Sequence, residues 1–94
     1  MTKQDVFDQL NDRGYDVEDE GNRLWLHYNT RHTRHHNSNT TEYYDWYYTD
    51  GVFSLHISED EYSPSENKTT TVYEDKITFS DFEDFMSSIE TYTY

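Results

Sequence analysis

The chain has no cysteine and no alanine, and it has only three glycines and one proline among its 94 residues. Without cysteine, disulfide bonds and thiolate chemistry are excluded, so a small secreted scaffold would lack its usual staples. Three glycines leave little material for a phosphate-binding loop, and no dinucleotide fingerprint, HExxH motif or nucleophile elbow occurs. We therefore expect a protein that is not an enzyme and that needs no cofactor.

Long apolar segments are absent as well. The opening MTKQDVFDQL contains no apolar run of signal-peptide length, and nowhere do eighteen apolar residues follow one another. We therefore expect a cytoplasmic protein with no membrane partner.

Aliphatic side chains are scarce and acidic side chains are abundant. Val, Leu, Ile and Phe together make sixteen residues, and the formal net charge is -13, a composition that leans toward disorder. Against this stand ten Tyr and two Trp, which can bury large areas while keeping a polar group, and periodic patterns flanked by turn residues. We expect one folded domain over residues 1–94 with a largely aromatic core.

Helical patterns stand at both ends of the chain. Thr2 is followed by Asp5 three positions later, and apolar residues at helical spacing continue to Leu10 before Arg13-Gly14. Near the other end, Ser80 and Glu83 form a capping-box pattern. The apolar stripe behind it consists of Phe82, Phe85, Met86 and Ile89. Both patterns predict amphipathic helices.

The middle of the chain predicts antiparallel strands. Alternating residues on both sides of Gly21-Asn22 and of Asp50-Gly51 indicate two hairpins, and residues 69–79 indicate one or two further strands. The polar segments 29–41 and 59–68 predict exposed loops. This order predicts an α+β fold, a four- to five-stranded antiparallel sheet with the N-terminal and C-terminal helices packed on one face.

The aromatic run EYYDWYYTD at residues 42–50 has more rings than one buried face needs. One of the sets Tyr44/Trp46/Tyr48 and Tyr43/Asp45/Tyr47 packs under the helices, and the other lies on an open face that Trp25 and His56 can join. Open aromatic sheets also occur in single-strand nucleic-acid binders, but these carry many basic residues. With only seven Lys and Arg, this chain repels a polyanion, and we expect no direct nucleic-acid binding.

Histidines gather in the segment RHTRHH. His32, His35 and His36, with His27 or His56, could ligate a transition metal through imidazole nitrogens. A structural zinc site usually needs four ligands at settled spacing, and no cysteine is present to contribute. We expect no metal site, and the simpler interpretation is a basic, solvated loop.

Carboxylates recur at short intervals. In a strand over residues 15–20, Asp16, Glu18 and Glu20 would point the same way about 6.6 Å apart, and residues 59–61 add a second cluster. Negative charge at this spacing is comparable to a phosphate backbone and attracts basic surfaces. A solubility coat and a halophilic host are the two alternative explanations.

At the level of class, this chain resembles the small acidic inhibitors of phages and toxin systems. The resemblance lies in its size, its charge and its surface of tyrosines and carboxylates. These include nucleic-acid-mimicking anti-restriction and anti-CRISPR proteins and immunity proteins that block nucleases. The resemblance implies an inhibitor that binds a basic, nucleic-acid-handling protein; the second hypothesis is a homodimer joined through the aromatic sheet face. The partner-binding residues that we expect are Asp16, Glu18, Glu20, Trp25, Tyr43, Asp45, Trp46, Tyr47, Glu59, Asp60 and Glu61.

Overall fold

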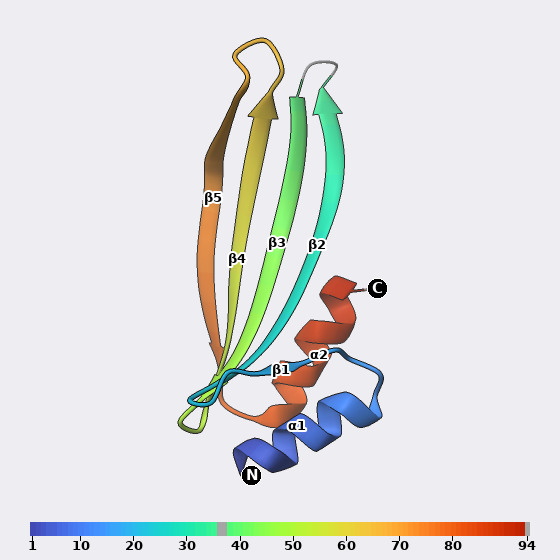
Figure 1. Ribbon diagram of the computed structural model, residues 1–94, viewed down its shortest axis with the longest axis vertical. Coiled ribbons are helices and arrows are strands. Elements are labelled where there is room, and N and C mark those ends of the chain that lie inside the picture. The colour runs from blue at the N-terminus through green and yellow to red at the C-terminus, as the bar shows by residue number, and fades with distance from the viewer. Residues whose placement is uncertain (36–37, 94) are drawn as a thin grey trace.

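The computed structural model of the protein describes residues 1–35 and 38–93, with the side chains of residues 31–38 outside that description. Two helices flank five strands along the chain (Figure 1). In order, the elements are α1 (Lys3–Asp12), β1 (Glu18–Asp19), β2 (Leu24–His35), β3 (Ser38–Thr49), β4 (Val52–Ser63), β5 (Lys68–Phe79) and α2 (Phe82–Thr93). Among these residues, neither helix is long and apolar enough to cross a membrane.

The strands form one antiparallel sheet in the order β1-β2-β3-β4-β5, so each strand pairs with its neighbour in the sequence. The predicted α+β fold is confirmed, and the number of strands is five. Asp50 and Gly51 join β3 to β4 with φ angles of 48° and 81°, the left-handed conformations that the Asp-Gly turn predicts.

The N-terminus of each helix is capped by a side chain. Thr2 and Asp5 form the predicted capping box at the start of α1, since each side chain bonds the other's backbone N–H. At α2 the prediction of Ser80 as the cap is wrong by one position. Asp81 Oδ1 accepts the N–H of Asp84 at 2.9 Å, and this carboxylate caps the helix instead.

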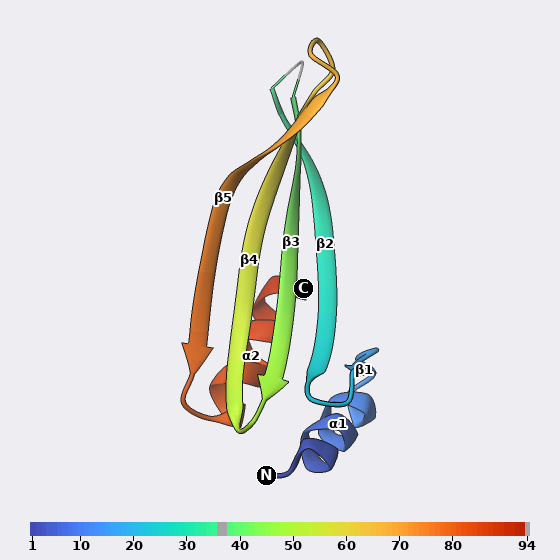
Figure 2. The ribbon, with the colours of Figure 1, turned by 60° about the vertical axis from the view of Figure 1, so that its left-hand side comes forward.

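One hydrophobic core lies between the helices and the lower half of the sheet (Figures 1 and 2). Val6 and Leu10 of α1 and Phe85 and Ile89 of α2 are buried there with residues of β2, β3 and β4. The set Tyr44/Trp46/Tyr48 faces this core. Trp46 is 0 % exposed, and its Nε1–H donates to Ser88 Oγ at 2.9 Å. The expectation that Trp46 contacts a partner is therefore wrong, because its ring fills the core.

Beyond the helices, β2, β3, β4 and β5 continue as a long sheet that no helix covers (Figures 1 and 2). The molecule measures 48 × 23 × 21 Å along its principal axes. The predicted loops at 29–41 and 59–68 are thus largely wrong. Residues 29–35 and 38–41 belong to β2 and β3, and residues 59–63 belong to β4. We call the part of β2–β5 beyond the helices the distal sheet.

The first hairpin is shorter than the alternating pattern predicts. Only Glu18 and Asp19 pair with β2, opposite Trp25 and Leu24. Asp16 and Glu20 lie outside the strand, so the predicted row of three carboxylates on one strand does not form. Val17, directly before β1, is 8 % exposed and joins the core.

Candidate functional site

The sheet face that points away from the helices carries a mixed aromatic and polar surface. We call this surface the open face and define it by Trp25, His27, Tyr43, Asp45 and Tyr47. Strand register places them in adjacent rows, since Trp25 lies opposite Tyr47, His27 opposite Asp45, and Tyr43 two residues before Asp45. The sequence expectation that Trp25 and His56 join this face is confirmed, because His56 lies opposite Asp45 on β4.

Asp45 holds the open face together. Its Oδ1 accepts the indole N–H of Trp25 at 2.8 Å and lies 2.7 Å from His27 Nδ1. The second ring nitrogen of His27 lies 3.3 Å from the amide nitrogen of Asn29, which can only donate. A proton on Nδ1 of His27 would be donated to Asp45. The carboxylate fixes the orientation of both rings.

The rings form a contiguous half-buried surface. The His27 ring lies 5.7 Å from the Trp25 ring and 6.1 Å from the Tyr43 ring, centroid to centroid. The Arg23 guanidinium lies 4.5 Å above the Tyr47 ring, where a cation–π contact is favourable. Burial, with the nearby Asp45 charge second, raises the pKa of the Tyr47 phenol, which keeps it neutral at physiological pH.

Glu20 is drawn into this surface indirectly. It accepts Arg23 Nε at 2.7 Å, and this hydrogen bond raises the pKa of the guanidinium. The chain of contacts from Glu20 through Arg23 to Tyr47 places an acidic group beside the aromatic face without a shared strand. Glu20 thus lies near the open face because it bonds Arg23, and not because it shares a strand with Asp16 and Glu18 as predicted.

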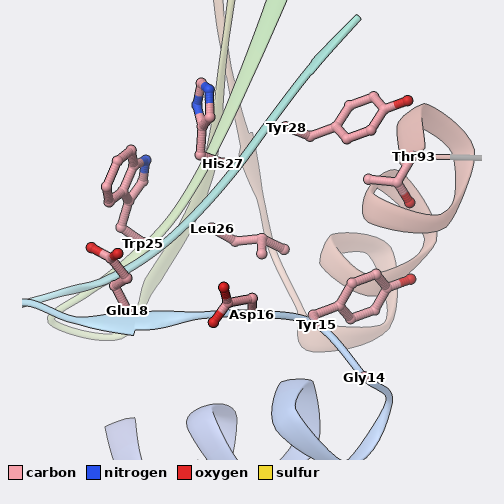
Figure 3. A pocket seen from close by; sticks show the side chains of 9 residues that line it. All are labelled: Gly14, Tyr15, Asp16, Glu18, Trp25, Leu26, His27, Tyr28 and Thr93. Carbon is pink, nitrogen blue, oxygen red and sulfur yellow. The ribbon is translucent and has the colours of Figure 1, made fainter.

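The free side of β2 is hollowed where it passes the segment before β1. This concavity has a volume of about 400 Å³ and is lined by Gly14, Tyr15, Asp16, Glu18, Trp25, Leu26, His27, Tyr28 and Thr93. Figure 3 shows Trp25 and His27 on one side of β2 and Leu26 and Tyr28 on the other, so the hollow follows the strand's edge. Asp16 and Glu18 give its lower border negative charge.

The second predicted carboxylate cluster, residues 59–61, is split between the two faces. Asp60 lies opposite Thr41, two positions before Tyr43, and so extends the open face along the distal sheet. Glu59 and Glu61 alternate with it and lie on the face that bears Trp46. There Glu59 lies opposite Glu42, and the Tyr44 hydroxyl donates to Glu42. Burial, followed by this bond to Glu42, raises the pKa of Tyr44 strongly.

Sequence reasoning did not assign Glu42, Arg23 or Asn29 to the candidate site. The period of two from Trp25 would have placed His27 and Asn29 on the same face. No comparable pattern predicts Arg23, because it precedes the strand and reaches Tyr47 only through its long side chain.

The His27–Asp45 pair resembles the histidine and acid of a catalytic triad. A catalytic histidine needs a nucleophile or substrate proton at its free nitrogen. In the structure that nitrogen lies beside Asn29, and within the described side chains no hydroxyl is hydrogen-bonded to His27. The arrangement holds the Trp25 and His27 rings in place, and the His27 side chain is 34 % exposed.

The candidate metal ligands of the histidine-rich segment cannot be placed in the open face. The side chains of His32, His35 and His36 lie outside the described part of the structure. Among the residues that are described, no group of three or more His, Asp or Glu side chains could hold a metal ion.

Comparisons of this chain with protein-family models, with curated proteins and with solved structures find no match.

Proposed function

We propose that this protein is a non-enzymatic binding protein that occupies a basic, nucleic-acid-handling protein and blocks it. The class of target is the one met by anti-restriction, anti-CRISPR and nuclease-immunity proteins. In this proposal, carboxylates attract the target and the open-face rings hold it.

The density of charge along the molecule carries the proposal. A net charge of -13 spread over a body 48 Å long corresponds to one charge per roughly 3.7 Å. One strand of B-form DNA carries a charge about every 3.4 Å along the axis. Summed over all sides of the molecule, the linear charge density is therefore similar to that of one DNA strand.

The open face supplies what charge alone does not. Buried interface energy comes mainly from aromatic and arginine anchors in desolvated positions, and rim charges mostly accelerate association. Trp25 and Tyr47 are half-buried and held by Asp45 and Arg23, so little side-chain entropy is lost when they are covered. Asp16 and Glu18 border the same surface.

The test begins with a partner recovered by pull-down and identified as a basic nucleic-acid enzyme. Association should slow as salt rises, because screening acts over about 8 to 10 Å at physiological ionic strength. The triple variant Asp16→Asn, Glu18→Gln, Glu20→Gln should mainly slow association, and Tyr47→Ala should mainly speed dissociation.

A matched control has the same loss of charge on α2, with Glu83→Gln, Asp84→Asn and Glu90→Gln at exposed positions on the helical side. The control should slow association less than the first triple variant. Association that ignores both salt and the first triple variant removes the charge-steering mechanism and leaves a solubility coat. A concentration-dependent dimer with no partner would favour self-association through the open face instead.

A further inference from the structure

The outer edge of β2 is mostly unpaired. β1 covers only Leu24 and Trp25, and the described strands place no other partner beyond them on that side. In an antiparallel pair, every second residue directs its N–H and C=O away from the neighbouring strand. Residues 26–30 of β2 therefore present free backbone donors and acceptors to a further strand.

The opposite edge of the sheet is protected by the devices that natural edge strands use. On β5 the register shifts between Tyr73 and Thr71, which is a bulge, and lysines flank the strand's exposed run at Lys68 and Lys76. The pairing of β2 with β3 stays regular from Leu24 to Thr33. A strand edge without a bulge accepts another strand more readily than a bulged edge.

The concavity described above lies along this open edge, with side chains of β2 on both sides of it (Figure 3). An added strand directs alternate side chains to opposite faces of the sheet. One set would meet Trp25 and His27, and the other would meet Tyr15 and Tyr28. This matches strand-addition recognition, in which backbone bonds give affinity and flanking pockets give selectivity.

Charge decides what kind of segment fits. The lining contains the carboxylates of Asp16 and Glu18 and no lysine or arginine. The aromatic rings beside them favour cations as well. A segment with Lys or Arg at alternate positions would pair with both features.

We propose that the free edge of β2 takes up an extended, Lys- or Arg-bearing segment of the basic partner as a sixth strand alongside residues 26–30. This inference rests on the proposed function, and it names the element of the partner that is recognised. It assigns the open face and the acidic border a shared role, because both flank the strand that is added.

The experiment uses a ten-residue peptide of alternating Lys and Thr, added to the isotope-labelled protein. A control peptide has the same sequence but backbone N-methyl groups on alternate residues, which keep the charge and remove pairing. Amide hydrogen exchange should show new protection within residues 26–30. The control peptide should bind about tenfold more weakly or worse, because several backbone bonds are lost.

Two double variants separate local charge from net charge. Asp16→Asn with Glu18→Gln should weaken the unmodified peptide about fivefold, as expected for two surface ion pairs. Glu83→Gln with Glu90→Gln on α2 has the same charge loss at exposed positions and should change binding less.

Equal binding of the two peptides would overturn strand addition yet leave the proposed function standing, since charge attraction would remain. Protection on β5 in place of β2, or no binding at all, would overturn it as well. Protection of β2 that grows with protein concentration in the absence of peptide would show that a second copy occupies the edge. A partner search that yields no basic protein would sink the proposed function whatever the peptides do.

Discussion

Two neighbouring aromatic residues of β3 should respond oppositely to truncation. Trp46 and Tyr47 are adjacent in sequence and lie on opposite faces of the sheet. We expect Trp46→Ala to destabilise the fold severely, and Tyr47→Ala to leave it largely intact while weakening partner binding.

The magnitudes follow from the surroundings of each ring. Trp46 is 0 % exposed, stacks on Tyr44 at 6.0 Å and donates to Ser88 at 2.9 Å. Truncating such a residue costs about 3 to 5 kcal/mol of unfolding free energy. Tyr47 is half-buried, and its chief contact is the Arg23 cation–π interaction, which contributes about 0.5 to 1 kcal/mol. A domain of this size has about 5 to 15 kcal/mol in total, so the first change removes a large share.

Urea unfolding followed by circular dichroism measures both variants in the same way, since fluorescence would lose Trp46 itself. With a slope of about 1 to 3 kcal/mol per molar urea, the Trp46 variant should unfold at least about 1 M earlier than wild type. If Trp46→Ala does not fold, Trp46→Phe gives a milder test, because it removes the N–H donor and part of the ring. Equal losses from Trp46→Ala and Tyr47→Ala would refute the assignment of the two faces.

Two further results are expected. Phe85→Ala should cost about 3 to 5 kcal/mol, because the ring is 1 % exposed and packs 4.9 Å from Phe53; a near-neutral effect in urea unfolding would mean that the core is misplaced. Because burial raises the pKa of Tyr44 in the folded state, its contribution to stability is complete below the unfolded pKa of about 10 and declines as pH rises above it. Tyr44→Phe should therefore show a shallower loss of unfolding free energy between about pH 9.5 and 11, and an unchanged slope would argue against the buried phenol.

Local signals predicted the elements whose ends depend on a few residues. Thr2 and Asp5 at the first helix, and Asp50-Gly51 at the central hairpin, act through backbone geometry that the sequence specifies directly. The apolar stripe of α2 was equally clear, because a helix on a sheet must bury one face. Even so, the cap fell on Asp81, since a neighbouring Ser and Asp offer the same chemistry to the same backbone groups.

The distal sheet was missed because hydrophobic alternation identifies only strands that bury a face. Residues 38–41 and 59–63 have no apolar side. Their pairing depends on backbone hydrogen bonds and on residues such as Thr40 and Thr41, whose branched side chains favour strands. A long hairpin nucleated by a strong turn extends into polar sequence once its register is set.

The candidate site was predicted in composition and only partly in place. Alternation gave two possible faces for residues 43–48 and could not choose between them, because both sets are aromatic. The choice comes from the helices, which cover the side that bears Trp46 and thereby leave Asp45 outside. Which aromatic set faces the core is therefore determined by long-range packing of the helices, and no local sequence pattern predicts it.

The chain carries more acid than solubility alone needs. A net charge of magnitude about 2 to 8 keeps a small domain soluble, and this chain carries -13. Charge beyond that need destabilises the compact state through self-repulsion. Two cations lie near the site, and each is paired with another acid. Lys3 bonds Asp19 at 2.9 Å and Arg23 bonds Glu20, so these pairs do not neutralise Asp16 or Glu18. Under the proposed function, the carboxylates of Asp16 and Glu18 beside the open edge of β2 would pair with a cation of the partner.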